Sequence, residues 1–191
     1  MDSFSIILVV VLLILVILSA FFSGSETSIM ALNQIKLDNA EKQGNKSAKI
    51  INSLRKEINR VLGVILIGNN LVNISASALL TFFVIKKFGD EYVWIGTLLL
   101  TIFIIIFAEI APKSFAAKRP ESIAYPASRI LKVLTKYLGS FSEILTNISN
   151  SLTGIKNNEN YFSENLNRDE LKSVLEKETK EVDLSLIHIS E

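Results

Sequence analysis

Three long stretches of the chain contain only apolar and uncharged polar residues. Residues 6–22, 61–85 and 92–108 contain no Asp, Glu, Lys or Arg. A helix that crosses a bilayer needs about 20 mostly apolar residues. Because each stretch reaches this length once its polar edges are added, the pattern predicts three transmembrane helices. The predicted spans are about 5–30, 61–85 and 92–112.

The first stretch is expected to stay in the protein as a span. Too few residues precede it for a long basic leader, and bulky Phe21 and Phe22 follow the small pair Ser19 and Ala20. That order is a poor signal-peptidase site, although a cleaved signal peptide is the alternative.

Helical spacing continues outside the spans. In 33–60 apolar residues recur at steps of three and four, which predicts a cytoplasmic amphipathic stretch leading into the second span. Residues 120–155 repeat this spacing but contain too many polar residues for a typical transmembrane helix. They predict an interfacial helix or helix pair on the cytoplasmic face, with a fourth span as the alternative. Residues 168–181 predict a short charged helix, and 182–191 fit no preceding pattern. The expected fold is an all-α membrane protein with three transmembrane helices and cytoplasmic juxtamembrane amphipathic helices.

The charged residues predict the topology. Lys and Arg gather in 33–60 and after residue 112, whereas the amino terminus carries only Asp2 and the 86–91 connection is balanced. By the positive-inside rule, the N-terminus lies outside and the C-terminus in the cytoplasm of a multi-pass plasma-membrane protein. The alternative is that the basic loops are only solvated surface, and the net charge of +1 says little about partners.

Several kinds of chemistry are excluded by composition. The chain has no cysteine, which removes disulfides, Cys-ligated zinc and thiol catalysis, and its one histidine, His188, lies in the last segment. The three apolar stretches contain no histidine, and apart from Glu109, which closes the third, they offer no intramembrane carboxylate for acid–base work. We therefore expect no enzyme activity, and no nucleic-acid partner.

Glu109 is the carboxylate that closes the third apolar stretch, just before Pro112. A carboxylate at membrane depth costs a few kcal/mol, so it normally faces the protein interior with a partner or a bound cation. Lys113 lies one helical turn further on, and a Glu109–Lys113 salt bridge is the main alternative to a cation site.

Uncharged polar residues accompany this carboxylate in the other two spans. Asn69, Asn73 and Ser77 share one face of a helix, as do Ser23 and Thr27. Hydroxyl, amide and carboxylate oxygens suit hard cations such as Mg²⁺, Ca²⁺ or Na⁺.

Backbone carbonyls could join this set, because Gly24 and Pro112 can free them by bending or breaking a helix. The alternative is that these residues only pack helices together, which we favour for Ser25, Asn70 and Ser75.

Three motifs resemble one known family. FFSGSETSIMAL in the first span, GNNLVN in the second and FAEIAPK in the third are similar to the transmembrane domain of the cyclin M / CorC family, over about residues 5–155. Bacterial members often carry a haemolysin-like label. The resemblance implies a homodimer of three-span units in the lipid bilayer that binds dehydrated Mg²⁺ between its helices. It also implies a cytoplasmic pair of cystathionine-β-synthase-type modules that bind nucleotide.

The resemblance also implies a set of metal ligands. Carried onto this chain, the set is Ser23, Gly24 through its carbonyl, Asn73, Ser77 and Glu109, with Asn69 and Ser28 as second choices. The expected function is membrane transport of a divalent cation, most simply Mg²⁺ efflux, with Na⁺ as a candidate coupled ion. The alternative is a membrane protein that senses Mg²⁺ or regulates another transporter without carrying the ion.

Two regions are expected. Residues 1–155 form the transmembrane domain with its juxtamembrane helices, and 156–191 form a charged cytoplasmic connector. Part of it, 163–181, resembles the acidic segment before the family's nucleotide-binding modules, and we expect the sequence to stop short of them. Nucleotide is then a partner only through that missing module.

Overall fold

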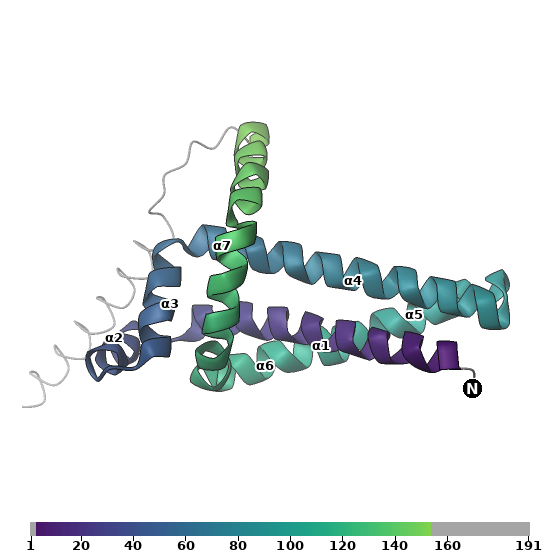
Figure 1. Cartoon of the computed structure of the whole chain (residues 1–191), viewed down its shortest axis with the longest axis horizontal. Helices are drawn as coiled ribbons and strands as arrows, with labels where there is room; N and C mark the ends of the chain where they lie inside the picture. Colours follow the sequence, from purple (N-terminus) through teal and green to yellow (C-terminus); the bar gives the residue numbers. More distant parts are fainter. Residues whose placement is uncertain (1–2, 154–191) are drawn as a thin grey trace, which may run out of the picture. The chain divides into compact units, whose positions relative to one another are not determined.

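Three long apolar helical segments form the frame of the protein. The computed structural model describes residues 3–153, and these are helical along almost their whole length. The segments long and apolar enough to cross a membrane are α1 (Ser3–Ala31), α4 (Ile58–Phe88) and Asp90–Lys118. They pack side by side (Figure 1). This confirms the predicted fold class, an all-α membrane protein with three spans.

The chain divides into two compact units, and the first, Met1–Thr146, contains the three spans. The hypotheses about residues 156–191, including the charged helix at 168–181, lie outside the described residues.

A tight turn joins the second and third spans. Gly89 follows α4 with a φ of +99°, a conformation that glycine adopts without strain. Its N–H donates to the carbonyls of Val84 and Ile85, which closes the last turn of α4. The short 3₁₀ helix η1 (Asp90–Tyr92) then begins the third span. The turn falls inside the predicted 86–91 connection.

The third span changes its helical type halfway along. It consists of α5 (Val93–Phe103), the π-helical segment η2 (Ile104–Ile110) and α6 (Ala111–Lys118). The Ala111 N–H donates to the Ile106 carbonyl, five residues earlier. Pro112 has no N–H to offer the carbonyl four residues before it. The wide π turn occupies the stretch in which that donor is missing, and π turns of this kind often occur at functional sites.

The stretch between the first two spans forms a helical hairpin. Its helices are α2 (Gln34–Lys42) and α3 (Lys46–Lys56). The side chains of Asn33 and Asn45 cap their first turns, and Gly44 turns the chain between them with a φ of +87°. The predicted helical character of this stretch is confirmed, and the structure divides it into two helices because Gly44 and Asn45 end one helix and cap the next.

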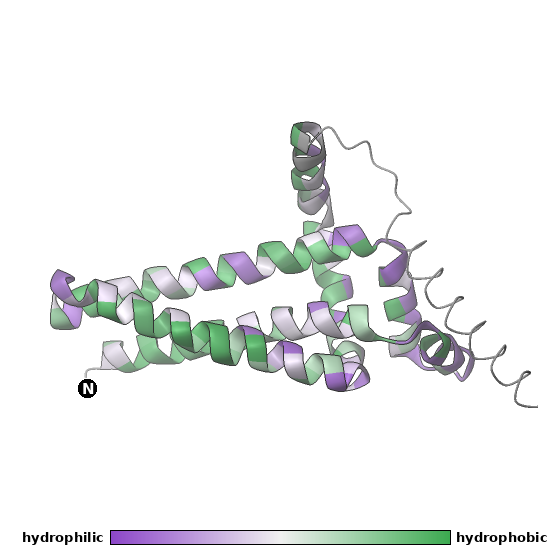
Figure 2. Cartoon of the chain, turned by 180° about the vertical axis from the view of Figure 1, so that it is seen from behind, coloured by the Kyte–Doolittle hydropathy of each residue, from purple (hydrophilic) through white to green (hydrophobic). Residues whose placement is uncertain are grey.

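Arg55 ties this hairpin to the end of the first span. One of its guanidinium nitrogens, Nη2, donates to the Ile29 carbonyl at 2.6 Å and to the Leu32 carbonyl at 2.7 Å. The last carbonyls of a helix lack donors and carry partial negative charge, so a cation there is favourable. Hydrophilic residues gather on α2 and α3, whereas hydrophobic residues follow the spans (Figure 2).

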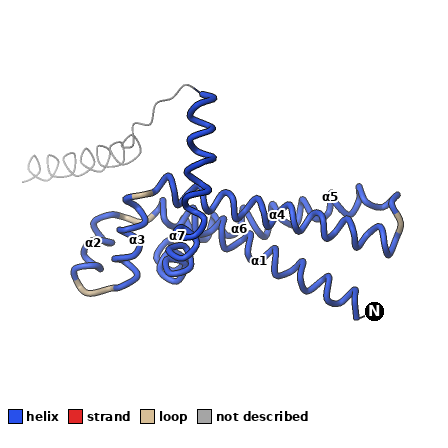
Figure 3. The backbone as a smooth tube through the Cα atoms, turned by 45° about the horizontal axis from the view of Figure 1, so that its top comes forward, coloured by secondary structure: helices blue, strands red, loops and turns tan. Residues whose placement is uncertain are grey.

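The last helix is α7 (Pro120–Thr153), and its part within the first unit, up to Thr146, runs across the spans and not along them (Figures 1 and 3). Ile123 lies against Gly24 of α1, and Ser142 lies against Gly63 of α4. Between these points Ala127 and Leu131 enter the core formed by α1 and α4. Among the described residues, α7 is not one of the helices apolar enough to span, so the fourth-span alternative finds no support.

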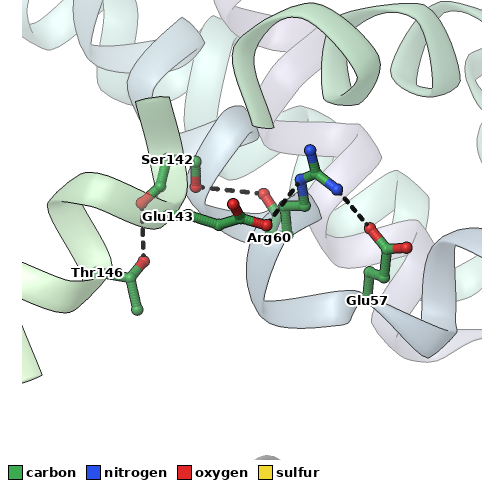
Figure 4. A network of polar contacts seen from close by, with 5 residues as sticks. All are labelled: Glu57, Arg60, Ser142, Glu143 and Thr146. Carbon is green, nitrogen blue, oxygen red and sulfur yellow. Dashed lines mark hydrogen bonds and ion pairs between the residues drawn. The ribbon is translucent and has the colours of Figure 1, made fainter. Parts of the chain in front are cut away.

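Two glycines let α7 approach α4 closely. A Cβ atom on Gly63 would collide with the Ser142 hydroxyl, and one on Gly139 would collide with the Arg60 guanidinium. The Ser142 hydroxyl donates to the Arg60 carbonyl, and Arg60 Nε lies 3.2 Å from a Glu143 carboxylate oxygen (Figure 4). Arg60 also pairs with Glu57, at 2.9 Å. The crossing therefore combines close backbone packing with a polar contact.

Candidate functional site in the spans

The C-terminal half of α1 carries a run of buried hydroxyl groups. Its members are Ser19, Ser23, Ser25 and Ser28, each no more than 1% exposed. A buried hydroxyl needs a hydrogen-bond partner or a ligand, because leaving it unpaired costs about 1–3 kcal/mol. The partners of these four serines therefore indicate which of them are already engaged.

Ser19 is engaged with the second span. Its hydroxyl donates to the side-chain oxygen of Asn69 at 2.9 Å. Hydrogen bonds of this kind join neighbouring helices in membranes. Ser19 was not predicted as part of the polar set, although its position four residues before Ser23 places the two on one face of α1.

Ser23 is engaged with the third span. Its hydroxyl donates to the backbone carbonyl of Glu109, at 3.4 Å. Glu109 lies in the π-helical segment η2, which packs directly against α1. The structure therefore brings together two of the predicted ligands, Ser23 and Glu109, through the backbone of the second.

The carboxylate of Glu109 is half-buried. It makes no hydrogen bond and no ion pair with any side chain in the described part of the chain, 3–153. A carboxylate in a membrane span usually has a counter-charge or borders an aqueous cavity. Within residues 3–153, no cationic side chain therefore pairs with the Glu109 carboxylate.

Lys113 is not the partner of Glu109. Its ammonium lies 3.7 Å from a carboxylate oxygen of Glu26, near the end of α1. Both side chains are about half exposed, at 48% and 47%, so this pair contributes at most about 1 kcal/mol. The alternative of a Glu109–Lys113 salt bridge is wrong in this structure, because the Lys113 ammonium pairs with Glu26.

Gly24 sits in an unbroken helix. α1 continues through it to Ala31, so the expected bend or break that would free its carbonyl does not occur. A Cβ atom on Gly24 would lie 3.4 Å from Ile123 and 3.5 Å from Pro112, an ordinary packing distance. The hydroxyl of Ser28 is also committed inside α1, since it donates to the Ser25 carbonyl.

Two buried oxygens in the spans have no partner. They are the Ser25 hydroxyl and the side-chain oxygen of Asn73. Neutral oxygens of this kind are what a hard cation accepts as ligands. Asn73 was predicted as a ligand, whereas Ser25 was assigned to packing.

The antiparallel packing of α1 and α4 separates the predicted ligands along the bundle. Phe4 meets Phe82 near one end, and Ser19 meets Asn69 nearer the other. At 1.5 Å per residue, Ser23 and Asn73 lie about 6 Å to either side of the Ser19–Asn69 contact.

Ser77 lies one turn further, about 18 Å from the level of Ser23. It is half-buried and borders a groove of about 600 Å³ with Ile74, Ala78, Thr81, Phe82 and Ile85. Two ligands of one Mg²⁺ lie at most about 4 Å apart, so this arrangement brings neither Asn73 nor Ser77 to Ser23. The full ligand set stays a prediction.

The chemistry available is therefore that of oxygen ligands around one carboxylate. The described residues contain no group of three or more His, Cys, Asp or Glu that could hold a metal. A cation in the spans would rely on Glu109 for charge and on neutral oxygens of α1 and α4 for the remaining contacts. Such a set suits a hard cation and not zinc or copper.

Comparison with known proteins gives a consistent result. The sequence profile of the Cyclin M transmembrane N-terminal domain matches residues 10–185. The UPF0053 inner membrane protein YfjD of Escherichia coli (strain K12) is 39% identical over 168 residues, which is 86% of this chain and 39% of that protein.

Other relatives come from distant organisms. A UPF0053 protein of Haemophilus influenzae is 44% identical over 129 residues, covering 68% of this chain and 31% of the relative. A chloroplastic DUF21 domain-containing protein of Arabidopsis thaliana is 34% identical over 159 residues, which is 83% of this chain and 24% of that protein. This chain thus spans well under half the length of the relatives that it matches.

Proposed function

The chain belongs to the cyclin M transmembrane N-terminal domain family, and from this premise we propose that it transports a divalent cation, Mg²⁺, across the membrane. The family is associated with Mg²⁺ transport, and the polar groups in the spans of this chain are oxygen donors. We propose Mg²⁺ as the substrate because a compact, hard dication favours oxygen ligands and strong local charge.

The observation that carries the proposal is the Glu109 carboxylate. It is half-buried in an apolar span, and Lys113, the lysine about one helical turn further along, is paired with Glu26. A carboxylate kept at this depth without a counter-charge is costly unless a cation binds there. The cation would supply the missing partner, which is why we favour a transport site over simple helix packing.

The neighbouring oxygens support a path along the α1–α4 seam. Starting from Glu109, the groups at successive helical turns are the Ser23 hydroxyl, the Ser19–Asn69 pair and the unpartnered oxygen of Asn73. Neutral oxygens along a path can replace the water of a cation without holding it too tightly to leave. The direction of movement we propose is efflux, with Na⁺ as the coupled ion.

Orientation and assembly are part of the same proposal. The basic residues of the α2–α3 hairpin favour a cytoplasmic location for it, which puts the N-terminus outside. The family resemblance favours a homodimer, and no chemical reaction is proposed.

The test is Mg²⁺ flux into proteoliposomes carrying the wild-type chain, Glu109→Gln or Glu26→Gln. Glu26→Gln is the matched control, because it removes one carboxylate from the same region but from an exposed ion pair. We expect flux in the wild type and in the control, and flux at the level of empty vesicles in Glu109→Gln. Equal flux in all three would remove Glu109 from the site.

A binding measurement separates transport from sensing. If the wild type binds Mg²⁺ and Glu109→Gln does not, but neither moves the ion, the chain is a sensor or regulator and the transport proposal fails. Binding can be followed as the rise in melting temperature that Mg²⁺ produces, because a ligand stabilises the state that binds it.

A further inference from the structure

The helix α7 has three distinct sides. The buried side packs on the spans and contains Ala124, Ala127, Leu131, Thr135 and Ser142. The other two sides are exposed, and their residues also follow steps of three and four. What we call the apolar side consists of Ile130, Val133, Tyr137, Phe141 and Ile144. What we call the basic side consists of Arg129, Lys132, Lys136, Ser140 and Glu143.

Contacts at the start of α7 show which way the apolar side faces. Ile123 lies seven residues, two helical turns, before Ile130 and so belongs to the apolar side. It packs on Gly24 and beside Pro112, both well inside the spans. The apolar side therefore faces toward the middle of the spans.

The basic side faces the opposite way. Tyr125 lies one turn before Arg129, and it packs against the cluster formed by Leu32 and Leu37 at the start of the hairpin. Further along, Glu143 meets Arg60 in the first turn of α4 (Figure 4). Both contacts lie at the ends of the spans, so the basic side faces the hairpin and the water beyond it.

This orientation matches the layers of a membrane surface. A helix that lies across the spans, with one side apolar and one side cationic, fits the boundary between acyl chains and headgroups. The apolar side is heavily exposed, with Tyr137 at 74% and Val133 at 55%.

We propose that α7 lies in the headgroup layer of an anionic leaflet, with its apolar side on the acyl chains and Arg129, Lys132 and Lys136 on lipid phosphates. The occupant of this surface is the bilayer, because three cations on the basic side complement anionic headgroups. The proposal does not depend on the transport function, since it rests on α7 alone.

Site-directed labels test the depth of the two sides. The chain has no cysteine, so Tyr137→Cys and Lys136→Cys each give one nitroxide site, on adjacent residues that point about 100° apart, one on the apolar side and one on the basic side. In vesicles containing phosphatidylglycerol, we expect the label at 137 to be reached by lipid-soluble oxygen and the label at 136 by a water-soluble nickel chelate. Nickel access at both sites would overturn the proposal. Spin–spin broadening of the label at 137, with neither oxygen nor the nickel chelate reaching it, would also overturn the proposal. That result would show that a second copy of the chain packs on the apolar side.

Charge removal tests the lipid phosphates. The variant Arg129→Gln/Lys132→Gln/Lys136→Gln is compared with Lys42→Gln/Lys46→Gln/Lys49→Gln, which removes the same charge from the hairpin. In detergent, phosphatidylglycerol is expected to raise the melting temperature of the wild type, and phosphatidylcholine is not. Each cation near an anionic surface is worth roughly fivefold in binding, so the α7 variant should need at least about tenfold more phosphatidylglycerol. The assignment of lipid binding to α7 would be overturned if the α7 variant needed no more phosphatidylglycerol than the wild type. It would also be overturned if both variants needed the same increase. The lipid-free melting temperature reports whether each variant is folded.

Discussion

The ring of Phe22 on α1 packs directly on the backbone of Gly68 in α4. A Cβ atom on Gly68 would lie 2.5 Å from the end of the ring, and Phe22 is itself 8% exposed. The ring therefore occupies the space that any other residue at 68 would fill. This contact sets the spacing of α1 and α4 immediately beside the Ser19–Asn69 hydrogen bond.

Replacing Gly68 by alanine is expected to destabilise the protein. Overpacking costs about 1–3 kcal/mol, which exceeds the gain of up to about 1 kcal/mol from the better helix propensity of alanine. Thermal unfolding in detergent measures the loss. Gly24→Ala is the matched control, because its Cβ atom would meet neighbours at ordinary distances. Phe22→Leu should partly restore the stability lost in Gly68→Ala. If Gly68→Ala alone is as stable as the wild type, the Phe22–Gly68 contact does not set the spacing of the two helices.

Ser23→Ala removes the hydroxyl that joins α1 to the Glu109 carbonyl. Hydrogen bonds between membrane helices contribute about 0.6 kcal/mol on average, so we expect a small loss of thermal stability. The larger effect should be a weaker stabilisation by Mg²⁺, because the proposed site loses one oxygen and its support for Glu109.

The control for this prediction is Ser75→Ala. The Ser75 hydroxyl donates to the Leu71 carbonyl in its own helix, at 2.7 Å, so the same substitution removes no contact between spans. If both variants respond to Mg²⁺ as the wild type does, Ser23 has only a packing role.

Pro112→Ala restores the N–H that the third span lacks. We expect η2 to tighten toward an α-helix, which would turn Glu109 relative to α1. The variant should therefore be as stable as the wild type without Mg²⁺ but should gain less stability when Mg²⁺ is added. An undiminished response to Mg²⁺ would mean that the π segment does not position the carboxylate.

Arg55→Lys keeps the positive charge at the end of α1 but loses the planar fork of donors. Arg55 donates to the Ile29 carbonyl through two nitrogens and to the Leu32 carbonyl through one of them. A single ammonium cannot match this geometry. We expect a fall of about 1–2 kcal/mol in stability, since hydrogen bonds to a charged group are worth about 1.5–3 kcal/mol. Proteolysis of the α2–α3 hairpin should also become faster, and Lys56→Ala, at an exposed neighbouring site, should change neither.

The spans could be predicted from sequence because the bilayer imposes a simple rule. Long stretches without charge must be helical, since each backbone polar group in lipid needs an internal partner. The 86–91 connection follows from the positions of charges and of Gly89, whereas the helices extend beyond the predicted spans, to Ile58 before the second and to Lys118 after the third. Capping signals at Asn33 and Asn45 were present in the hairpin as well, and reading them would have divided it correctly.

The partners in the site were harder to predict. The alternative of a Glu109–Lys113 pair assumed that residues four apart share a helix face, but the π turn at η2 widens the helix there and Lys113 meets Glu26. Similarly, Asn69, Asn73 and Ser77 do share a face, yet a shared face extends along the whole helix. The spacing of residues within one helix does not show at which height a neighbouring helix contacts that face. For this reason the contact of Ser19 with Asn69 was not predicted.

The contact of Ile123 with Gly24 has a mechanical consequence. Ile123 sits in the first turn of α7 and lies against Gly24, next to Ser23, whose hydroxyl donates to the Glu109 carbonyl. Further along, Ser142 and Glu143 hold α7 to Arg60 of α4. If α7 tilts about this second contact, its first turn is expected to push on α1 at Gly24, and the neighbouring Ser23 would transmit the movement to the backbone of Glu109.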